Sequence, residues 1–174
     1  MMILKRIAVI GTGYVGLVSG TCFAEIGNSV VCCDIDAEKI RSLSAGIMPI
    51  YERGLQELVD KNVNDNRLFF STDIPKAIKD SEIIYIAVGT PMSENGEADL
   101  KYVKEVAETI GKYLNGYKVI VNKSTVPVGT GKLVQSIIEQ HTNGKHPFDV
   151  VSNPEFLREG TAIYDTMNME RAVI

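Results

Sequence analysis

The sequence lacks a hydrophobic run that would span a membrane, since such a segment takes about 18 consecutive apolar residues. Its first residues, "MMILKRIAVIG", hold a basic pair inside a short apolar run. A secretory signal has its positive charges first and a small-residue cleavage site afterwards. We therefore interpret this segment as a strand, and we expect a cytoplasmic protein that has no membrane partner.

Positive charge and cysteine are also scarce. The formal net charge is −4, whereas nucleic acids select basic surfaces, so we predict no nucleic-acid partner. A phosphorylated ligand is still compatible, because backbone dipoles can hold a phosphate on an acidic protein. The only cysteines are Cys22, Cys32 and Cys33, and they form no CxxC motif. We predict that they are reduced core thiols and that the protein has no metal site.

Six apolar runs stand out in this chain of 174 residues, a length typical of one domain. Each run is typical of a strand that is buried on both faces of a sheet. The runs cover residues 6–11, 29–34, 67–71, 82–90, 117–124 and 148–152. We also expect residues 171–174, "RAVI", to begin a seventh strand.

Helical patterns lie between most of these runs. Val15, Val18, Cys22 and Ile26 recur at spacings of three and four residues before Gly27, which is placed to end the helix. Similar patterns cover residues 37–46, 54–63, 103–114 and 130–140. Strands that alternate with helices form right-handed crossovers. We therefore predict an α/β fold: a doubly wound Rossmann-type sheet, mostly parallel, with about six strands and helices on both faces.

A glycine motif joins the first predicted strand to the first helix. "VIGTGYVG" contains Gly11, Gly13 and Gly16 in a GxGxxG arrangement, and this strand–helix setting is the one that dinucleotide binding requires. Gly11 permits the tight turn, Gly13 lets the backbone approach a pyrophosphate, and Gly16 lets the helix pack close to the strand. The free N–H groups of the helix start then face the anion.

Asp34 stands at the end of the second predicted strand. A carboxylate there accepts hydrogen bonds from ribose hydroxyls and repels a 2′-phosphate, so it favours NAD over NADP as cofactor. No arginine follows at position 35 to reverse this preference. The alternative is a tight strand–helix turn with a helix-capping aspartate, but the coincidence of glycines, strand, helix and acid favours the dinucleotide motif.

Three further stretches follow the ends of predicted strands four to six, where doubly wound sheets bind their ligands. They are "VGTP" at 88–91, "NKSTVPVGT" at 122–130 and "SNPEFLREG" at 152–160. Thr90, Ser124 and Thr125 offer hydroxyls that suit a ribose, a nicotinamide amide or a bound water.

In the last stretch, Asn153 and Pro154 predict the cap and first position of a helical turn. Such a turn would place Glu155 and Glu159 on one face and end at Gly160. Two carboxylates near a nicotinamide can bind a sugar, or one of them can act as general acid or base. A capped surface turn with solvated glutamates explains the same spacing, so the spacing alone leaves both interpretations open.

At these residues the chain closely resembles the NAD-binding N-terminal domain of the UDP-glucose/GDP-mannose dehydrogenase family. One small departure is Arg53, where the family often has proline. The matching stretches are "IAVIGTGYVGLVSG", "VVCCDIDAEKI", "PIYERGL", "AVGTP", "NKSTVPVGT" and "SNPEFLREGTAIYD".

The resemblance implies an oxidoreductase that converts UDP-glucose to UDP-glucuronate. Such enzymes oxidise the C6 alcohol with two NAD and pass through a cysteine thioester. Their nucleophilic cysteine lies in a later domain, and none of the three cysteines here has its context. We therefore expect residues 1–174 to be the N-terminal part of a longer dehydrogenase, without its helical linker and UDP-binding domain and inactive alone. The full-length protein is expected to be a homodimer or larger.

The resemblance also assigns roles to residues. Glu155 would be the acid/base of the thioester steps, and Thr125 would help to hold a catalytic water. Residues expected to bind the cofactor are Gly11, Thr12, Gly13, Tyr14, Val15, Gly16, Asp34, Lys39, Thr90, Thr125 and Glu159. Residues expected to bind the UDP-sugar are Glu155, Phe156, Leu157, Arg158 and Glu159. Two alternatives remain: a sister enzyme acting on UDP-N-acetylmannosamine or GDP-mannose, and a stand-alone NAD-binding sensor module.

Overall fold

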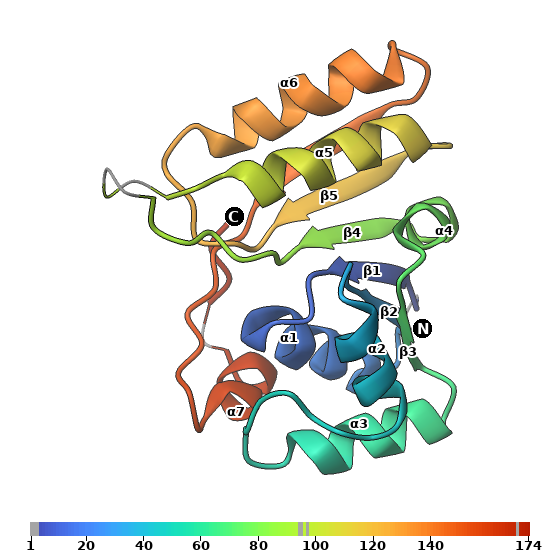
Figure 1. Cartoon of the computed structure of the whole chain (residues 1–174), viewed down its shortest axis with the longest axis vertical. Helices are drawn as coiled ribbons and strands as arrows, with labels where there is room; N and C mark the ends of the chain where they lie inside the picture. Colours follow the sequence, from blue (N-terminus) through green and yellow to red (C-terminus); the bar gives the residue numbers. More distant parts are fainter. Residues whose placement is uncertain (1–3, 94–95, 97, 170) are drawn as a thin grey trace.

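The computed structural model describes residues 4–93, 96, 98–169 and 171–174, so residues 1–3 of the N-terminal segment lie outside it. One sheet of six strands forms its centre, in the order β3-β2-β1-β4-β5-β6, and neighbouring strands are all parallel (Figure 1). The reversal of strand order between β1 and β4 confirms the doubly wound Rossmann prediction. The strands are β1 (Arg6–Ile10), β2 (Ser29–Cys33), β3 (Leu68–Ser71), β4 (Ile83–Ile86), β5 (Lys118–Asn122) and β6 (Phe148–Ser152).

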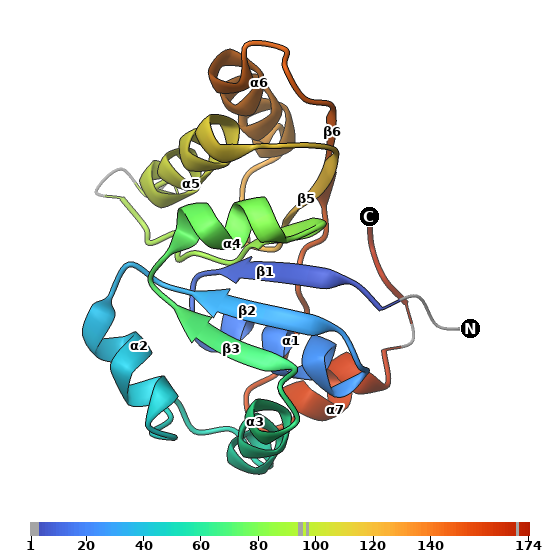
Figure 2. The same ribbon diagram turned by 90° about the vertical axis from the view of Figure 1, so that its right-hand side faces the viewer.

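Helices cover both faces of the sheet. The helices are α1 (Tyr14–Glu25), α2 (Ala37–Ser44), α3 (Leu55–Asn64), α4 (Ile74–Asp80), α5 (Lys101–Tyr113), α6 (Thr130–Thr142) and α7 (Ala162–Met167). Helices α4, α5 and α6 pack in series on one side, while α3 and α7 both pack against α1 on the other (Figures 1 and 2). Along β1, Ile7 and Val9 join one buried cluster and Ala8 and Ile10 the other. This alternation explains why the predicted strand is apolar throughout.

The sequence analysis predicted neither α4 nor the six-residue helix α7. Asp73 caps α4 by accepting a hydrogen bond from the Lys76 amide at 2.9 Å, and a proline lies in its first turn. Its seven residues bury only Ile74, Ala77 and Ile78. Such a short helix shows too few repeats for its periodicity to stand out. No helix among the described residues is long and apolar enough to cross a membrane.

Two local predictions are wrong. Residues 153–158 form no helical turn, because the Asn153 amide pairs with Asn122 O at 2.9 Å and Glu155 Oε2 accepts the Leu157 amide at 2.6 Å. Gly160, with φ of +89°, therefore precedes helix α7 instead of ending a helix. Residues 171–174 form no strand, and Val173 O accepts a hydrogen bond from Asn153 Nδ2 instead of joining a ladder.

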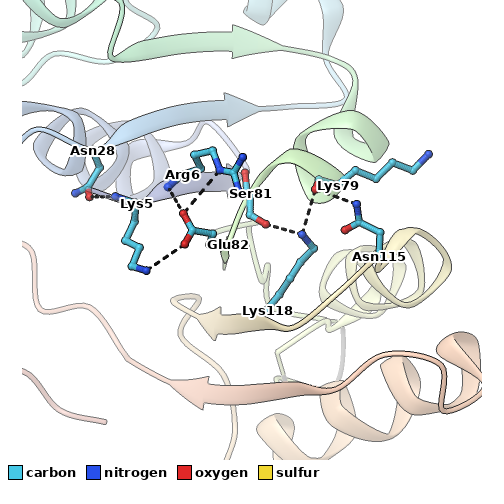
Figure 3. A network of polar contacts seen from close by, with 8 residues as sticks. All are labelled: Lys5, Arg6, Asn28, Lys79, Ser81, Glu82, Asn115 and Lys118. Carbon is cyan, nitrogen blue, oxygen red and sulfur yellow. Dashed lines mark hydrogen bonds and ion pairs between the residues drawn. The ribbon is translucent and has the colours of Figure 1, made fainter. Parts of the chain in front are cut away.

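A polar network joins the amino ends of the central strands, at the edge opposite the predicted ligand sites. Figure 3 shows the Glu82 carboxylate accepting from the Arg6 amide and from Lys5 Nζ, each at 3.1 Å. Lys118 is 4% exposed, and its Nζ donates to Ser81 O at 2.5 Å and Lys79 O at 3.2 Å. Burial lowers the pKa of Lys118, and the nearby Arg6 lowers it further. These bonds tie the starts of β1, β4 and β5 to the end of α4.

Candidate functional site

The glycine loop is closely packed on its inner side and open on its outer side. Gly11 has φ of +106°, and a Cβ there would lie 2.4 Å from Ala87 O. A Cβ on Gly16 would lie 1.9 Å from Gly11 O. At Gly13, by contrast, a Cβ would meet no described atom within 4 Å. The first and third glycines are therefore required by packing, whereas the second faces open space.

That open space has the features of an anion site. Helix α1 begins at Tyr14 with Gly13 as its N-cap, and among the described residues no side chain caps it. The first turn also contains no acidic residue. Amides of a first helical turn have no partner within the helix, so these point their N–H groups outward. A dinucleotide pyrophosphate fits here without displacing any side chain.

Asp34 is joined to the glycine loop by direct hydrogen bonds. Its Oδ2 accepts from the Thr12 amide at 3.0 Å, from Thr12 Oγ1 at 2.7 Å and from Lys39 Nζ at 3.1 Å. Its side chain is 13% exposed. Burial opposes ionisation, but the hydrogen bonds from Thr12, the Asp36 amide and Lys39 outweigh it and lower the pKa of Asp34. The loop and the acid thus form one unit, with Lys39 beside them as expected.

A cavity of about 540 Å³ adjoins this unit. Its lining mixes polar and apolar residues, and α5 contributes the polar Glu105 and Thr109 beside Val106. Other lining residues are Gly13, Asp34, Lys39, Ile74 and Val88. Apolar walls with a few polar groups suit a ribose joined to an adenine ring.

The ends of β4 and β5 also come together. Thr90 Oγ1 donates to Thr125 O at 2.9 Å, and Ser124 Oγ donates to Val88 O at 2.7 Å. These bonds fix the loop after β5 against the loop after β4. Thr125 itself is exposed, so its hydroxyl remains accessible at the carboxyl edge of the sheet.

On the face of the sheet that carries α1, a second cavity of about 450 Å³ is lined by Lys123, Asn153, Glu155 and Leu157. Lys123 Nζ donates to Asn153 Oδ1 at 3.2 Å. Burial lowers the pKa of Lys123, and the charge of the Glu155 carboxylate, which lines the same cavity, opposes that shift. The sequence analysis gave Lys123 no role, although a lysine directly after the apolar run of β5 was a usable signal.

The remaining predicted substrate residues have different surroundings. Phe156 is 69% exposed, whereas Leu157 packs against the core cluster of α1. Arg158 Nη2 and Nε donate to the two Asp165 carboxylate oxygens at 2.7 and 3.0 Å, so its guanidinium is committed to α7. Glu159 is exposed and directly precedes Gly160, whose amide shares the Glu52 carboxylate with the Tyr14 hydroxyl. The backbone of Glu159 therefore lies near the start of α1, whereas the Arg158 guanidinium is held by α7.

Glu52 is the second residue that the sequence analysis missed. It lies between α2 and α3 and is only 5% exposed. Its carboxylate accepts hydrogen bonds from the Tyr14 hydroxyl, from the Gly160 amide at 2.7 Å and from the Ala162 amide at 3.0 Å. Burial opposes ionisation of Glu52, but these bonds outweigh it and lower its pKa. Its partners lie far away in the sequence, so no local pattern could have indicated them.

The three cysteines are free and buried, as predicted. Burial raises the pKa of Cys22 to about 11 and that of Cys33 to about 12, and it raises the pKa of Cys32 as well. A thiol must ionise to act as a nucleophile, so these three are unsuited to covalent catalysis near neutral pH. Within the described part of the chain, no group of three or more His, Cys, Asp or Glu side chains could hold a metal ion.

Residues 5–174 match the NAD-binding domain of the UDP-glucose/GDP-mannose dehydrogenase family. The chain is 76% identical to UDP-glucose 6-dehydrogenase TuaD of Bacillus subtilis (strain 168) over 171 residues, which are 98% of this chain and 37% of that protein. A UDP-glucose dehydrogenase structure from Pyrobaculum islandicum has a TM-score of 0.94 and 37% identity, covering 98% of this chain and 40% of that one. A GDP-mannose dehydrogenase structure from Pseudomonas aeruginosa has a TM-score of 0.88 and 39% identity, covering 92% of this chain and 38% of that one.

Proposed function

This chain belongs to the UDP-glucose/GDP-mannose dehydrogenase family as an NAD-binding domain, and from that premise we propose that it is the cofactor half of a UDP-glucose 6-dehydrogenase. The whole enzyme would oxidise the C6 alcohol of UDP-glucose to the carboxylate of UDP-glucuronate. The observation that carries the proposal is the joined unit of Asp34 and Thr12 beside the open side of Gly13. When bound there, NAD supplies the electron acceptor for the oxidation.

The cofactor would lie along the carboxyl edge of the sheet. The loop from Gly11 to Gly16 would hold its pyrophosphate, with the amides of the first turn of α1 as donors because they have no partner within the helix. Asp34 would accept the adenosine ribose hydroxyls, with Lys39 beside it. Thr90 and Thr125, which hydrogen-bond to each other, would contact the nicotinamide side. Glu159 would reach the cofactor as well, and the hydrogen bonds of Glu52 to Tyr14 and to Gly160, the residue after Glu159, support that placement.

Glu155 is the proposed general acid/base, and Thr125 helps to hold the water that it activates. Residues 155–159 as a whole would line the sugar. Two facts support the role of Glu155: it lines a cavity, and the basic side chain of Lys123 lines the same cavity. Because Arg158 is paired with Asp165, its backbone is better placed than its guanidinium to meet the substrate.

The nucleophile of the thioester step would come from another part of a longer protein. The raised pKa values of the buried cysteines support this assignment, as does the fraction of the relatives' length that the chain spans. We propose that residues 1–174 precede a helical linker and a UDP-binding domain. The complete enzyme would be a homodimer or larger assembly in the cytoplasm.

The test uses the full-length protein with NAD and a panel of nucleotide sugars, followed by NADH absorbance. UDP-glucose should be the preferred substrate. Preference for GDP-mannose is the second candidate, since the two dehydrogenase structures are similarly identical to this chain. Glu155→Gln should lower kcat by about 10²–10⁴-fold without lowering the melting temperature. The exposed Glu57→Gln is the matched control. No turnover of any nucleotide sugar despite NAD binding would favour a sensor module instead.

A further inference from the structure

A buried carboxylate connects the glycine loop to the segment that the proposed function assigns to the substrate. Glu52 Oε2 accepts from the Tyr14 hydroxyl and the Gly160 amide, and Oε1 accepts from the Ala162 amide. Tyr14 is the first residue of α1 and directly follows Gly13. One side chain therefore contacts both the proposed pyrophosphate site and the end of the substrate-facing segment.

The segment between residues 153 and 160 is attached at both ends. At one end the Asn153 amide donates to Asn122 O at 2.9 Å, which fixes it to the end of β5. At the other end the Gly160 amide donates to Glu52 at 2.7 Å. The residues between them form no regular structure, so their position depends on these two attachments, on the Arg158–Asp165 ion pair to α7 and on the packing of Leu157.

Glu52 also replaces a local helix cap. Among the described residues no side-chain bond caps α7, whose N-cap residue is Thr161. The Ala162 amide instead donates to Glu52 at 3.0 Å, so the start of α7 is set by a residue from the α2–α3 connection. Burying a carboxylate is unfavourable unless several donors surround it, and an apolar residue would fill the same space more easily. The arrangement suits a residue that fixes the positions of its hydrogen-bond partners relative to one another.

We propose that Glu52 and Tyr14 are positioning residues that couple occupation of the glycine loop to the placement of residues 155–160. The inference rests on the proposed function, since it assumes that this loop binds the cofactor and that this segment meets the sugar. Any displacement of the first turn of α1 is transmitted through the Tyr14 hydroxyl and Glu52 to the Gly160 amide. By reciprocity, fixing the segment favours the loop conformation that binds the cofactor.

The test measures amide hydrogen exchange at Gly160 and Ala162 in this chain, with and without NAD. In the native chain NAD should slow exchange at both amides. Tyr14→Phe removes the hydroxyl donor and nothing else. Glu52→Gln keeps the volume but turns an NH₂ group toward at least one backbone N–H. Each variant should exchange about tenfold faster at these two amides and lose the response to NAD. Tyr51→Phe, a change at a neighbouring tyrosine that is 90% exposed, is the matched control.

Two further measurements separate positioning from general stability. Tyr14→Phe should leave exchange in β1 and β5 unchanged, and combining it with Glu52→Gln should add little because both act through one link. In the full-length enzyme, Tyr14→Phe should lower kcat for the sugar nucleotide more than it changes the KM for NAD.

Native exchange rates at Gly160 and Ala162 in Tyr14→Phe would overturn the inference, as would equally accelerated exchange throughout the chain. If Glu52→Gln does not fold, Tyr14→Phe still decides. Failure of the proposed function is distinguishable, because it appears as absent NAD binding by titration calorimetry in the native chain. The faster exchange expected of the variants without NAD does not depend on that result.

Discussion

Replacing Asp34 by alanine should shift cofactor preference from NAD toward NADP. The carboxylate would no longer accept the ribose hydroxyls, and it would no longer repel a 2′-phosphate. In addition, Lys39 Nζ lies 3.1 Å from Asp34 Oδ2 and would lose its anionic partner. The side chain of Lys39 is 31% exposed and lines the same cavity, so it can turn toward a phosphate.

The size of the shift follows from two contributions. A hydrogen bond to a charged group contributes about 1.5–3 kcal/mol, so NAD should bind roughly ten- to 150-fold more weakly. Two charges about 4 Å apart interact by about 1–4 kcal/mol between the dielectric of water and that of a protein surface. Removing this repulsion should strengthen NADP binding by about fivefold or more. The ratio of the two dissociation constants should therefore change by about 50-fold or more.

Titration calorimetry of NAD and NADP against the native chain, Asp34→Ala and Asp34→Ala/Lys39→Met measures both contributions. The double variant should lose the gain in NADP affinity. Glu38→Gln, which removes an exposed acid nearby, should change neither constant. The Thr12 amide also loses its acceptor in Asp34→Ala, so the melting temperature of this variant shows whether the loop is destabilised. Unchanged NADP affinity in Asp34→Ala, or an equal gain without Lys39, would refute the reasoning.

Three other outcomes are expected. Gly13→Ala should abolish NAD binding in calorimetry with little loss of melting temperature, because its Cβ enters only the open space. Gly16→Ala should instead unfold the loop, because its Cβ would lie 1.9 Å from Gly11 O. NAD binding by Gly13→Ala would place the pyrophosphate elsewhere. The three thiols should react with a thiol reagent at about pH 8 only as fast as the chain unfolds, since burial raises their pKa values; rapid labelling of folded protein would contradict this. The free energy of unfolding should decrease as pH falls from about 5 to about 2. Arg158 lowers the pKa of Asp165 to about 2, and hydrogen bonds lower the pKa values of Glu52 and Asp34 despite their burial. Carboxyl groups of the unfolded chain titrate near pH 4. The unfolded chain then binds more protons, so denaturant titrations that show constant or rising stability between these pH values would contradict the assignment.

Most of the fold could be predicted because its determinants lie close together in the sequence. Each strand is an apolar run of four or five residues, and the glycine loop and Asp34 belong to one strand–helix–strand unit. The hydrogen bonds that join Thr12 to Asp34 confirm that this unit forms as its sequence indicates. The exceptions are α4 and α7, whose seven and six residues carry too little periodicity to be distinguished from loops.

The segment from residue 153 to residue 160, which we propose faces the substrate, was predicted less well, because distant residues decide its conformation. Asn153 and Pro154 have the local preference for a helix start, but the Asn153 amide pairs with the end of β5 and the Glu155 carboxylate accepts the Leu157 amide. Glu52 bonds to Gly160 across 108 positions of sequence. A propensity argument weighs only neighbours, so it favoured the helical turn and overlooked Glu52.

This difference between the two halves has a physical reason. A pyrophosphate is bound mainly by backbone amides, and a short loop before a helix can present them without help from distant residues. An acid that acts on a substrate must instead be held at a fixed distance from the bound cofactor, and a loop without regular structure cannot provide that alone. In this chain the distance between the two halves is set by the Tyr14–Glu52–Gly160 hydrogen bonds, which start at the cofactor loop itself. The buried charge of Glu52 is tolerated because the Tyr14 hydroxyl and the Gly160 and Ala162 amides all donate hydrogen bonds to it. Losing one donor should therefore affect the placement of Glu155 and Glu159 before it affects the binding of the cofactor.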